Sequence, residues 1–320
     1  MINKTILIGG YVVIAILVII VIVILVLNNN YNEAQSTFYK KFKDTNNVAL
    51  PAFDGEFGAE IDRAIPHAHA LYRQWRLRSV ACMEGMRSFY EGIFDSAVVI
   101  VQPNRRRRDG NGPAWKHILG NNNHAPIRIL WEPPVYVGRF RRPLRYPDGV
   151  DLSKPLFIIH NKYTTEWDGP PVNFIPEVVV HDLCNRLDPH FTIVVVHPSS
   201  SAPGYTPDNQ GGQLSNPNLT SAFAYDGLLT IQVLLALNSA MDYNTIQLAL
   251  HDGCKHFVSV QGGSSRMASL FGGTNVVLHI SGSEIASKEY DTVLARLSDV
   301  KLHVVRSVPE LLGVAARLRP

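Results

Sequence analysis

Short apolar runs alternate with amphipathic stretches through the second half of the chain. The runs PLFIIHN (155–161), FTIVVVHP (191–198) and HFVSV (256–260) are continuous and apolar, which is typical of strands buried on both faces. Helices are predicted between and after them, and PEVVVHDLCNRL (176–187) begins with a proline that favours a helix start. Short buried strands alternating with helices predict a parallel sheet with helices on both faces. The remaining predicted elements are helices at 228–241, 244–253, 264–271 and 308–318 and strands at 275–281 and 301–307.

The pattern is weaker between residues 47 and 150, although strand and helix signals still alternate. VALPAF (48–53) and RSVACM (78–83) predict strands, and IDRAIPHAHALYRQW (61–75) predicts a helix whose beginning is weakened by Pro66. A segment rich in proline and arginine at 133–155 is typical of a connection. We therefore expect two Rossmann-like α/β units, at 47–150 and 151–320, with a ligand site at the carboxyl ends of their strands.

A charge-free apolar run at 5–27 precedes both units. As a helix it would be about 34 Å long, enough to cross a bilayer core. A cleaved signal peptide is the competing interpretation, but its apolar core is normally shorter and ends at a small-residue cleavage site. We expect a short tail at 1–4, a retained signal anchor, a polar stem at 28–46, and type II orientation with the soluble part in the ER or Golgi lumen or on virus-modified host membranes.

Composition restricts the function classes. The 320 residues carry a net charge of +3, too small to predict nucleic acid as a partner, and three scattered cysteines indicate neither a disulfide framework nor a metal cluster. The basic run Arg105–Arg108 favours a solvated loop, with an anionic glycan or lipid headgroup as the alternative. Asn218 is a possible glycosylation acceptor, and His67 and His69 point to different helix faces, which argues against a paired metal site.

The stretch HFVSVQGGSSRMASLF suggests a phosphate-binding turn. A strand is followed by Gln261, Gly262 and Gly263, and then by a helix whose first residues are Ser264 and Ser265. Free N–H groups and the positive end of the dipole at such a helix start bind phosphate. The motif is neither GxxxxGK[ST] nor GxGxxG, which disfavours ATPases and dehydrogenases. A strand-turn-helix without a ligand is the plain structural alternative.

Two further side chains are candidates for the same site. Lys162 follows the strand at 155–161 and, at the same sheet edge, would offset phosphate charge, with Trp167 near it. Glu60 begins the predicted helix of the first unit and is a candidate general base for an acceptor hydroxyl. An ordinary surface lysine and a helix-start acid are the respective alternatives.

Four stretches carry a resemblance to a known family: FGAEIDRAIPHAHALYRQW, WEPPVY, PLFIIHNKYTTEWDGPPVNF and CKHFVSVQGGSSRMASLFGGTNVV. Together they resemble a group of glycosyltransferases with the GT-B fold found in large DNA viruses of algae and protists, and in some algae and fungi. The likeness covers most of residues 47–318. It implies a nucleotide-sugar donor in the second unit and a glycan or glycoprotein acceptor in the first, although a first unit of this size is small for the fold.

Carried over to this sequence, the resemblance assigns Lys162 and the turn from Gln261 to Ser265 to the diphosphate. It assigns Glu284 to the ribose hydroxyls and Glu60 to the acceptor side. It implies no metal and no cofactor beyond the donor, and Asp208 is either part of a loop over the donor or an ordinary turn acid. Two alternatives stay open: an inactive glycan-binding or structural membrane protein, and a hydrolase with Ser264 as nucleophile and His279 or His303 as base. Arg266 stands where the hydrolase motif GxSxG requires its last glycine.

Overall fold

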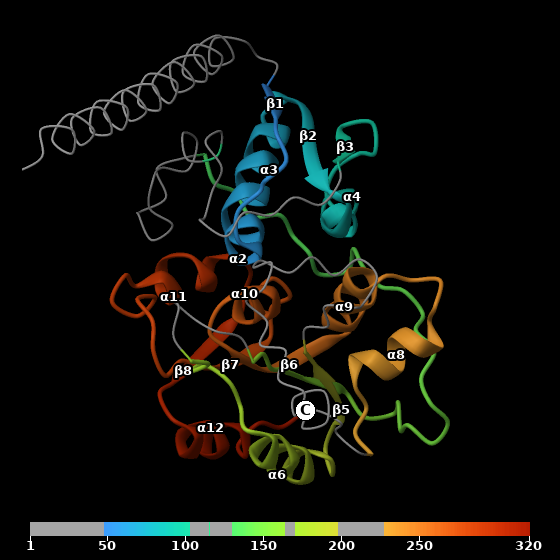
Figure 1. Ribbon diagram of the computed structural model, residues 1–320, viewed down its shortest axis with the longest axis vertical. Helices are drawn as coiled ribbons and strands as arrows, with labels where there is room; N and C mark the ends of the chain where they lie inside the picture. Colours follow the sequence, from blue (N-terminus) through green and yellow to red (C-terminus); the bar gives the residue numbers. More distant parts are fainter. Residues whose placement is uncertain (1–47, 103–114, 116–129, 164–169, 198–226) are drawn as a thin grey trace, which may run out of the picture. The chain divides into compact units, whose positions relative to one another are not determined.

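The computed structural model describes residues 48–102, 115, 130–163, 170–197 and 227–320 (Figure 1). Residues Ala49–Pro320 form one compact unit. No helix within the described ranges is long and apolar enough to cross a membrane. The predicted span at 5–27 lies outside those ranges, as do Arg105–Arg108, Trp167, Asp208 and Asn218.

Five parallel strands form the larger sheet, in the order β5-β4-β6-β7-β8. Each overlaps a run that predicted a strand, although β6 and β7 begin before the predicted bounds, so the prediction of a parallel α/β sheet in the second half is confirmed. The continuous apolar runs made this prediction possible, because strands covered on both faces need apolar side chains at every position. The strands are β4 (Leu156–His160), β5 (Thr192–Val196), β6 (Cys254–Val260), β7 (Thr274–Leu278) and β8 (Lys301–Val305).

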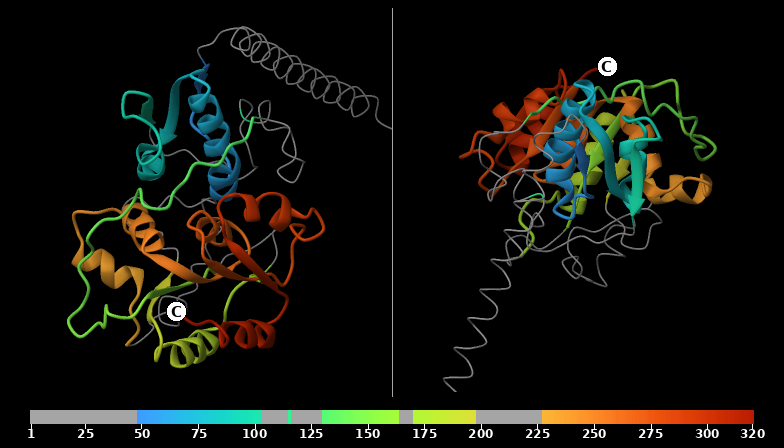
Figure 2. Two further views of the ribbon diagram at one scale, coloured as in Figure 1. Left: turned by 180° about the vertical axis from the view of Figure 1, so that it is seen from behind. Right: turned by 90° about the horizontal axis from the view of Figure 1, so that it is seen from above.

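Helices cover both faces of this sheet (Figures 1 and 2). On one face α6 (Glu177–Leu187) and α12 (Val308–Ala315) bury an apolar core that includes Leu183 and Leu311. The opposite face carries three helices, and the chain between β7 and β8 forms one short α-helix and a 3-10 turn. These elements are α8 (Ile231–Leu237), α9 (Tyr243–Asp252), α10 (Gly263–Ser269), α11 (Glu289–Thr292) and the turn Leu294–Arg296.

The strand order reverses between β4 and β6. After β4 the chain crosses to its neighbour β5, whereas after β6 it proceeds the other way, to β7 and β8. Loops leaving two such strands diverge, and the space outside their carboxyl ends is where open α/β sheets bind ligands. The sheet therefore has a switch point at His160 and Val260, the last residues of β4 and β6.

A second, smaller sheet has the order β1-β2-β3, and β2 and β3 are parallel. β1 and β2 confirm the strands predicted at 48–53 and 78–83, and α3 and α4 pack against β2. Its elements are β1 (Val48–Leu50), α2 (Phe57–Ala59), a π-helical turn (Glu60–Ala64), α3 (Ile65–Arg73), β2 (Leu77–Met83), a 3-10 turn (Glu84–Met86), α4 (Arg87–Glu91) and β3 (Val99–Gln102).

Pro66 explains why the first helix is interrupted. Proline has no N–H to donate to the carbonyl four residues earlier, which is that of Asp62. The chain passes this point through the π-helical turn, and the Asp62 carbonyl accepts from the indole Nε1 of Trp131 at 2.8 Å. The backbone N–H of Glu132 donates to the carbonyl of Pro66. A polar group freed by the proline is thus satisfied from a segment almost 70 residues away.

The predicted connection at 133–155 is held to the folded elements along its length. Both carboxylate oxygens of buried Asp252 accept backbone N–H groups from it, those of Gly138 at 2.6 Å and Phe140 at 2.8 Å. Further along, Arg145 and Asn238 exchange two hydrogen bonds. This connection is therefore docked against α8 and α9 by side-chain-to-backbone bonds.

Candidate functional site

Polar side chains from the ends of neighbouring strands meet at the switch point. Lys162 follows β4, Gln261 follows β6, and Lys162 Nζ lies 3.4 Å from Gln261 Oε1. Asn173, in the loop after Lys162, donates to the same Gln261 oxygen at 3.2 Å. Its side-chain Oδ1 accepts from the backbone N–H groups of Ile280 and Ser281, just beyond β7. Three adjacent strand ends are thus joined through one buried asparagine.

Asn161 holds the loop that carries Lys162. Its side chain is fully buried and bonds both the N–H and the carbonyl of Ile175, at 2.9 and 2.8 Å. Its oxygen also accepts from the backbone N–H of Lys162. The ends of the loop are therefore fixed although its middle, 164–169, lies outside the described residues.

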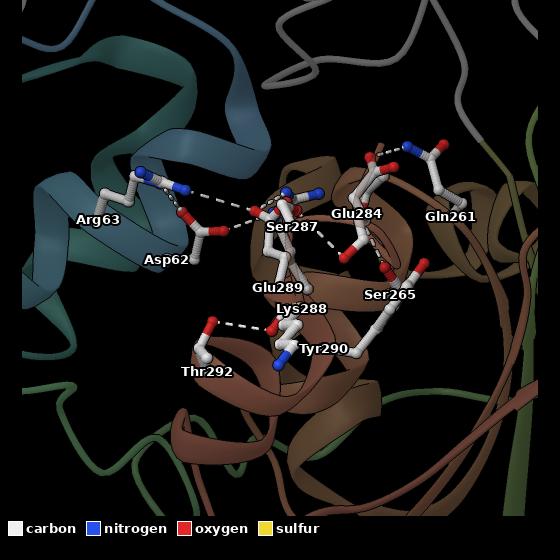
Figure 3. A network of polar contacts seen from close by, with 12 residues as sticks. Asp62, Arg63, Gln261, Ser265, Glu284, Ser287, Lys288, Glu289, Tyr290 and Thr292 are labelled. Atoms are coloured by element: carbon white, nitrogen blue, oxygen red, sulfur yellow. Dashed lines mark hydrogen bonds and ion pairs between the residues drawn. The ribbon is translucent and has the colours of Figure 1, made fainter. Parts of the chain in front are cut away.

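Glu284 completes this group, which we call the strand-end cluster: Lys162, Asn173, Gln261 and Glu284 (Figure 3 shows Gln261 and Glu284). Its Oε1 accepts from Gln261 Nε2. Its Oε2 is buried and has no hydrogen-bond partner within the described residues, and the whole side chain is only 5% exposed. A buried carboxylate oxygen without a donor is unfavourable unless a ligand or water supplies one.

The glycine turn beside this cluster differs in part from the prediction. Gly262 has φ +105°, a conformation that favours glycine, and an added Cβ there would lie 3.0 Å from Lys162 Nζ. Gly263, however, is covered: its Cβ would lie 2.8 Å from Cδ1 of Phe57 in α2. Ser264 and Ser265 are buried, and Ser265 Oγ donates back to the Gly262 carbonyl at 2.9 Å. The predicted phosphate site therefore has fewer accessible groups than the sequence suggested, because Phe57 covers Gly263 and the two serines are buried.

Glu60 also differs from the prediction. It lies in the π-helical turn with no exposed surface, and its Oε1 accepts from Tyr90 Oη at 3.0 Å. A general base must reach the acceptor hydroxyl directly or through one water molecule. The burial of Glu60 argues against that role and favours a structural one.

Sequence reasoning missed a second charged group, which we call the ion-pair cluster: Asp62, Arg63, Arg266 and Glu289 (Figure 3). Arg266 in α10 bonds Asp62 Oδ2 through Nε and Glu289 Oε1 through Nη2, both at 2.5 Å. Arg63 lies 3.6 Å from Asp62 and 3.5 Å from Glu289. All four side chains are buried or nearly so, and an added Cβ at Gly58 would lie 2.9 Å from Arg266 Cδ.

Charge compensation governs the ion-pair cluster. Burial alone would lower the pKa of Arg266, but the carboxylates of Asp62 and Glu289 outweigh it and raise that pKa. Burial raises the pKa of Asp62, and the two arginines oppose this rise. Two cations facing two anions at these distances hold the π-helical turn, α10 and α11 together.

The positions of the histidines do not support the hydrolase alternative. His279 Nδ1 is hydrogen-bonded to Tyr290 Oη at 2.8 Å, and His303 is exposed on β8. Within the described residues, no group of three or more histidine, cysteine, aspartate or glutamate side chains is arranged to hold a metal ion.

Comparisons with known proteins find only weak structural similarity. No protein-family model and no curated protein matches the sequence. Among solved structures, the chain is similar to ADP-heptose lipopolysaccharide heptosyltransferase II of Escherichia coli, with 11% identity, 89% of this chain and 80% of that chain covered, and a TM-score of 0.34. A proposed UDP-N-acetylglucosamine 2-epimerase of Listeria monocytogenes gives 12% identity, 90% and 68% coverage, and the same TM-score. These likenesses are too weak to assign a function. The α/β architecture with parallel sheets follows from the fold itself.

Proposed function

We propose that this chain binds a nucleoside-diphosphate sugar at the strand-end cluster and transfers the sugar to a glycan or glycoprotein acceptor, anchored in a membrane through residues 5–27. One observation carries the proposal: Lys162, Gln261 and Glu284 converge at the switch point of a parallel sheet, and Glu284 retains a buried acceptor without a donor. A cation and a hydrogen-bond acceptor side by side suit a ligand with a phosphate at one end and hydroxyls beside it. The GT-B resemblance supports the same assignment.

In such a transfer the bond between the anomeric carbon and the diphosphate oxygen breaks as the acceptor oxygen attacks that carbon. Negative charge grows on the departing diphosphate, and Lys162 is placed to stabilise it together with the half-buried Gly262–Gly263 backbone. This assistance needs no metal. The carboxylate of Glu284 is placed to accept hydroxyl hydrogens of the donor. The proton of the acceptor hydroxyl requires a base, and the burial of Glu60 leaves that role open.

Donor binding tests this proposal. Detergent-solubilised full-length protein is titrated with uridine, guanosine and adenosine diphosphates and their sugar conjugates, and the dissociation constant is measured by calorimetry. Because a charge-assisted hydrogen bond contributes about 1.5–3 kcal/mol, Lys162→Ala should weaken binding at least about tenfold. Lys154→Ala is the matched control, since Lys154 precedes the opposite end of the same strand and donates to the carbonyl of Asp188. Equal affinities of the two variants, or no binding of any of these nucleotides, would refute the assignment.

The burial of Glu60 also favours a second candidate, a protein that binds nucleotide sugars or glycans without transferring them. Binding accompanied by neither transfer nor donor hydrolysis would select this candidate. Within the transferase hypothesis, Glu60→Gln separates a structural role of Glu60 from a role as general base. Unchanged transfer activity supports the structural role. Loss of transfer activity in a normally folded variant supports the role as general base.

A further inference from the structure

Trp75 is the most exposed large hydrophobic side chain within the described residues, with 91% of its surface accessible. It stands just after α3 and has φ +58°, the left-handed region that a bulky residue adopts only at an energetic cost. Exposing an indole in this conformation lowers the stability of the fold without any gain in packing. An exposed indole held in a strained backbone conformation indicates a contact with another molecule or surface.

Arginines surround this tryptophan. Arg73 and Arg78 are exposed and Arg76 is partly exposed. Arg73 has one loose ion pair, with Nε 3.6 Å from Glu132 and both side chains largely in solvent. Among the described residues, the side chain of Arg76 donates to the neutral side chain of Gln74 alone. The turn therefore presents an indole among three positive charges, and only one of these has an acidic partner within the described residues.

The turn lies at one particular end of the smaller sheet. The carboxyl end of α3, the start of β2 at Leu77 and the start of β1 at Val48 lie at the same end (Figures 1 and 2). The residues that lead into β1 are the polar stem at 28–46 and, before it, the apolar run at 5–27. The end of the sheet that carries Trp75 is thus the end tethered to the predicted anchor.

We propose that Trp75, Arg73, Arg76 and Arg78 form a membrane-docking patch that contacts the anionic headgroups of the bilayer in which the chain is anchored. The inference rests on the proposed anchor but not on the proposed chemistry. Tryptophan is favoured at the headgroup level of a bilayer, where its ring is buried and its N–H is hydrated. Arginines near an anionic surface add electrostatic attraction that falls off within a Debye length. Docking would bring the end of the smaller sheet that carries Trp75 into contact with the membrane.

The test uses the full chain reconstituted into lipid nanodiscs of phosphatidylcholine alone or with one-fifth phosphatidylserine, each containing lipid brominated near the headgroup. Bromine quenches tryptophan at contact distance, and comparison with Trp75→Phe isolates Trp75 from the three other tryptophans. We expect quenching that is stronger with phosphatidylserine, weaker in 0.5 M salt, and lost in Trp75→Phe. Arg76→Gln combined with Arg78→Gln should reduce the docked fraction with phosphatidylserine, by about fivefold for each charge removed.

Arg141→Gln combined with Arg142→Gln is the matched control, because it removes two exposed charges from the connection between the sheets and should leave the quenching unchanged. Equal quenching in wild type and Trp75→Phe overturns the patch. Shielding of Trp75 that requires an added protein, with no quenching by lipid, overturns it in favour of a protein partner. Failure of the chain to enter nanodiscs overturns the anchor and the patch together, whereas nucleotide binding, measured separately, is affected by none of these outcomes.

Discussion

The strand-end cluster and the ion-pair cluster both adjoin the short helix α10, and they differ in how completely their charges are paired. In the ion-pair cluster each charge faces an opposite charge, and Arg266 is bonded to both Asp62 and Glu289. Asp62 Oδ1 is also buried without a hydrogen-bond partner among the described residues, but it lies 3.6 Å from the Nε of Arg63. In the strand-end cluster Glu284 has one bonded oxygen and one buried oxygen without a donor. The comparison teaches that buried charge alone does not identify a binding site. Among the described residues, a buried acceptor with neither a donor nor a facing cation does so better, because it leaves an interaction that a ligand can satisfy.

Breaking the ion-pair cluster should have the largest effect on stability. Arg266→Ala leaves Asp62 and Glu289 buried without their main partner, and loss of one member of a buried pair costs about 3–5 kcal/mol. The free energy of unfolding from urea denaturation measures this. Arg186→Ala, which breaks an exposed pair on α6, is the control and should change little. Equal effects of the two variants would show that the cluster is not closed to water.

The two buried histidines of β4 and α9 should give the next largest effect. His160, at the end of β4, and His251, in α9, are buried with ring centroids 5.6 Å apart, and burial lowers the pKa of His251 to about 4. The unfolded chain takes up a proton near pH 6.5 that the folded chain resists, so stability is complete above pH 6.5 and falls as the pH drops. His251 alone should account for about 3 kcal/mol between pH 6.5 and pH 4.

Urea midpoints at pH 7 and pH 5 check this prediction. His251→Phe should flatten the pH dependence, whereas the exposed His303→Phe should leave it as in wild type. An unaltered slope in His251→Phe would mean that other groups determine the acid sensitivity, and would direct attention to the carboxylates of the ion-pair cluster.

We expect the smallest effect on stability from a substitution at Gly262. This substitution would also disturb Lys162 of the strand-end cluster directly. Gly262→Ala forces a side chain into a left-handed conformation and against Lys162, which should cost on the order of 1–2 kcal/mol and weaken nucleotide binding. Gly313→Ala is the contrasting control, because Gly313 is inside α12 with open space around it and should gain stability. Normal nucleotide affinity in Gly262→Ala would place the phosphate elsewhere.

The larger sheet could be predicted from the sequence because most positions of its strands are apolar, and parallel strands place Lys162 and Gln261 at one edge of the sheet. The sequence did not indicate which acids are buried. Glu60, Asp62 and Glu289 all look like surface residues in their local patterns, and only tertiary packing removes them from water. In the sequence, Arg266 is notable only as a departure from a hydrolase motif. Asn173 lies in one of the stretches that carry the family resemblance, but a loop asparagine is normally attributed to a turn, so the sequence does not predict that it joins three strand ends.

The bonds of Asp252 to Gly138 and Phe140 have a consequence for movement within the protein. A connection between two sheets often serves as a hinge, and rigid-body rotation about it closes the molecule over its substrate. Here a buried carboxylate clamps the connection to α9, so rotation at that point would expose a charge-assisted pair of hydrogen bonds. We therefore expect any closure to be small, with a radius of gyration that scarcely changes when the ligand is added.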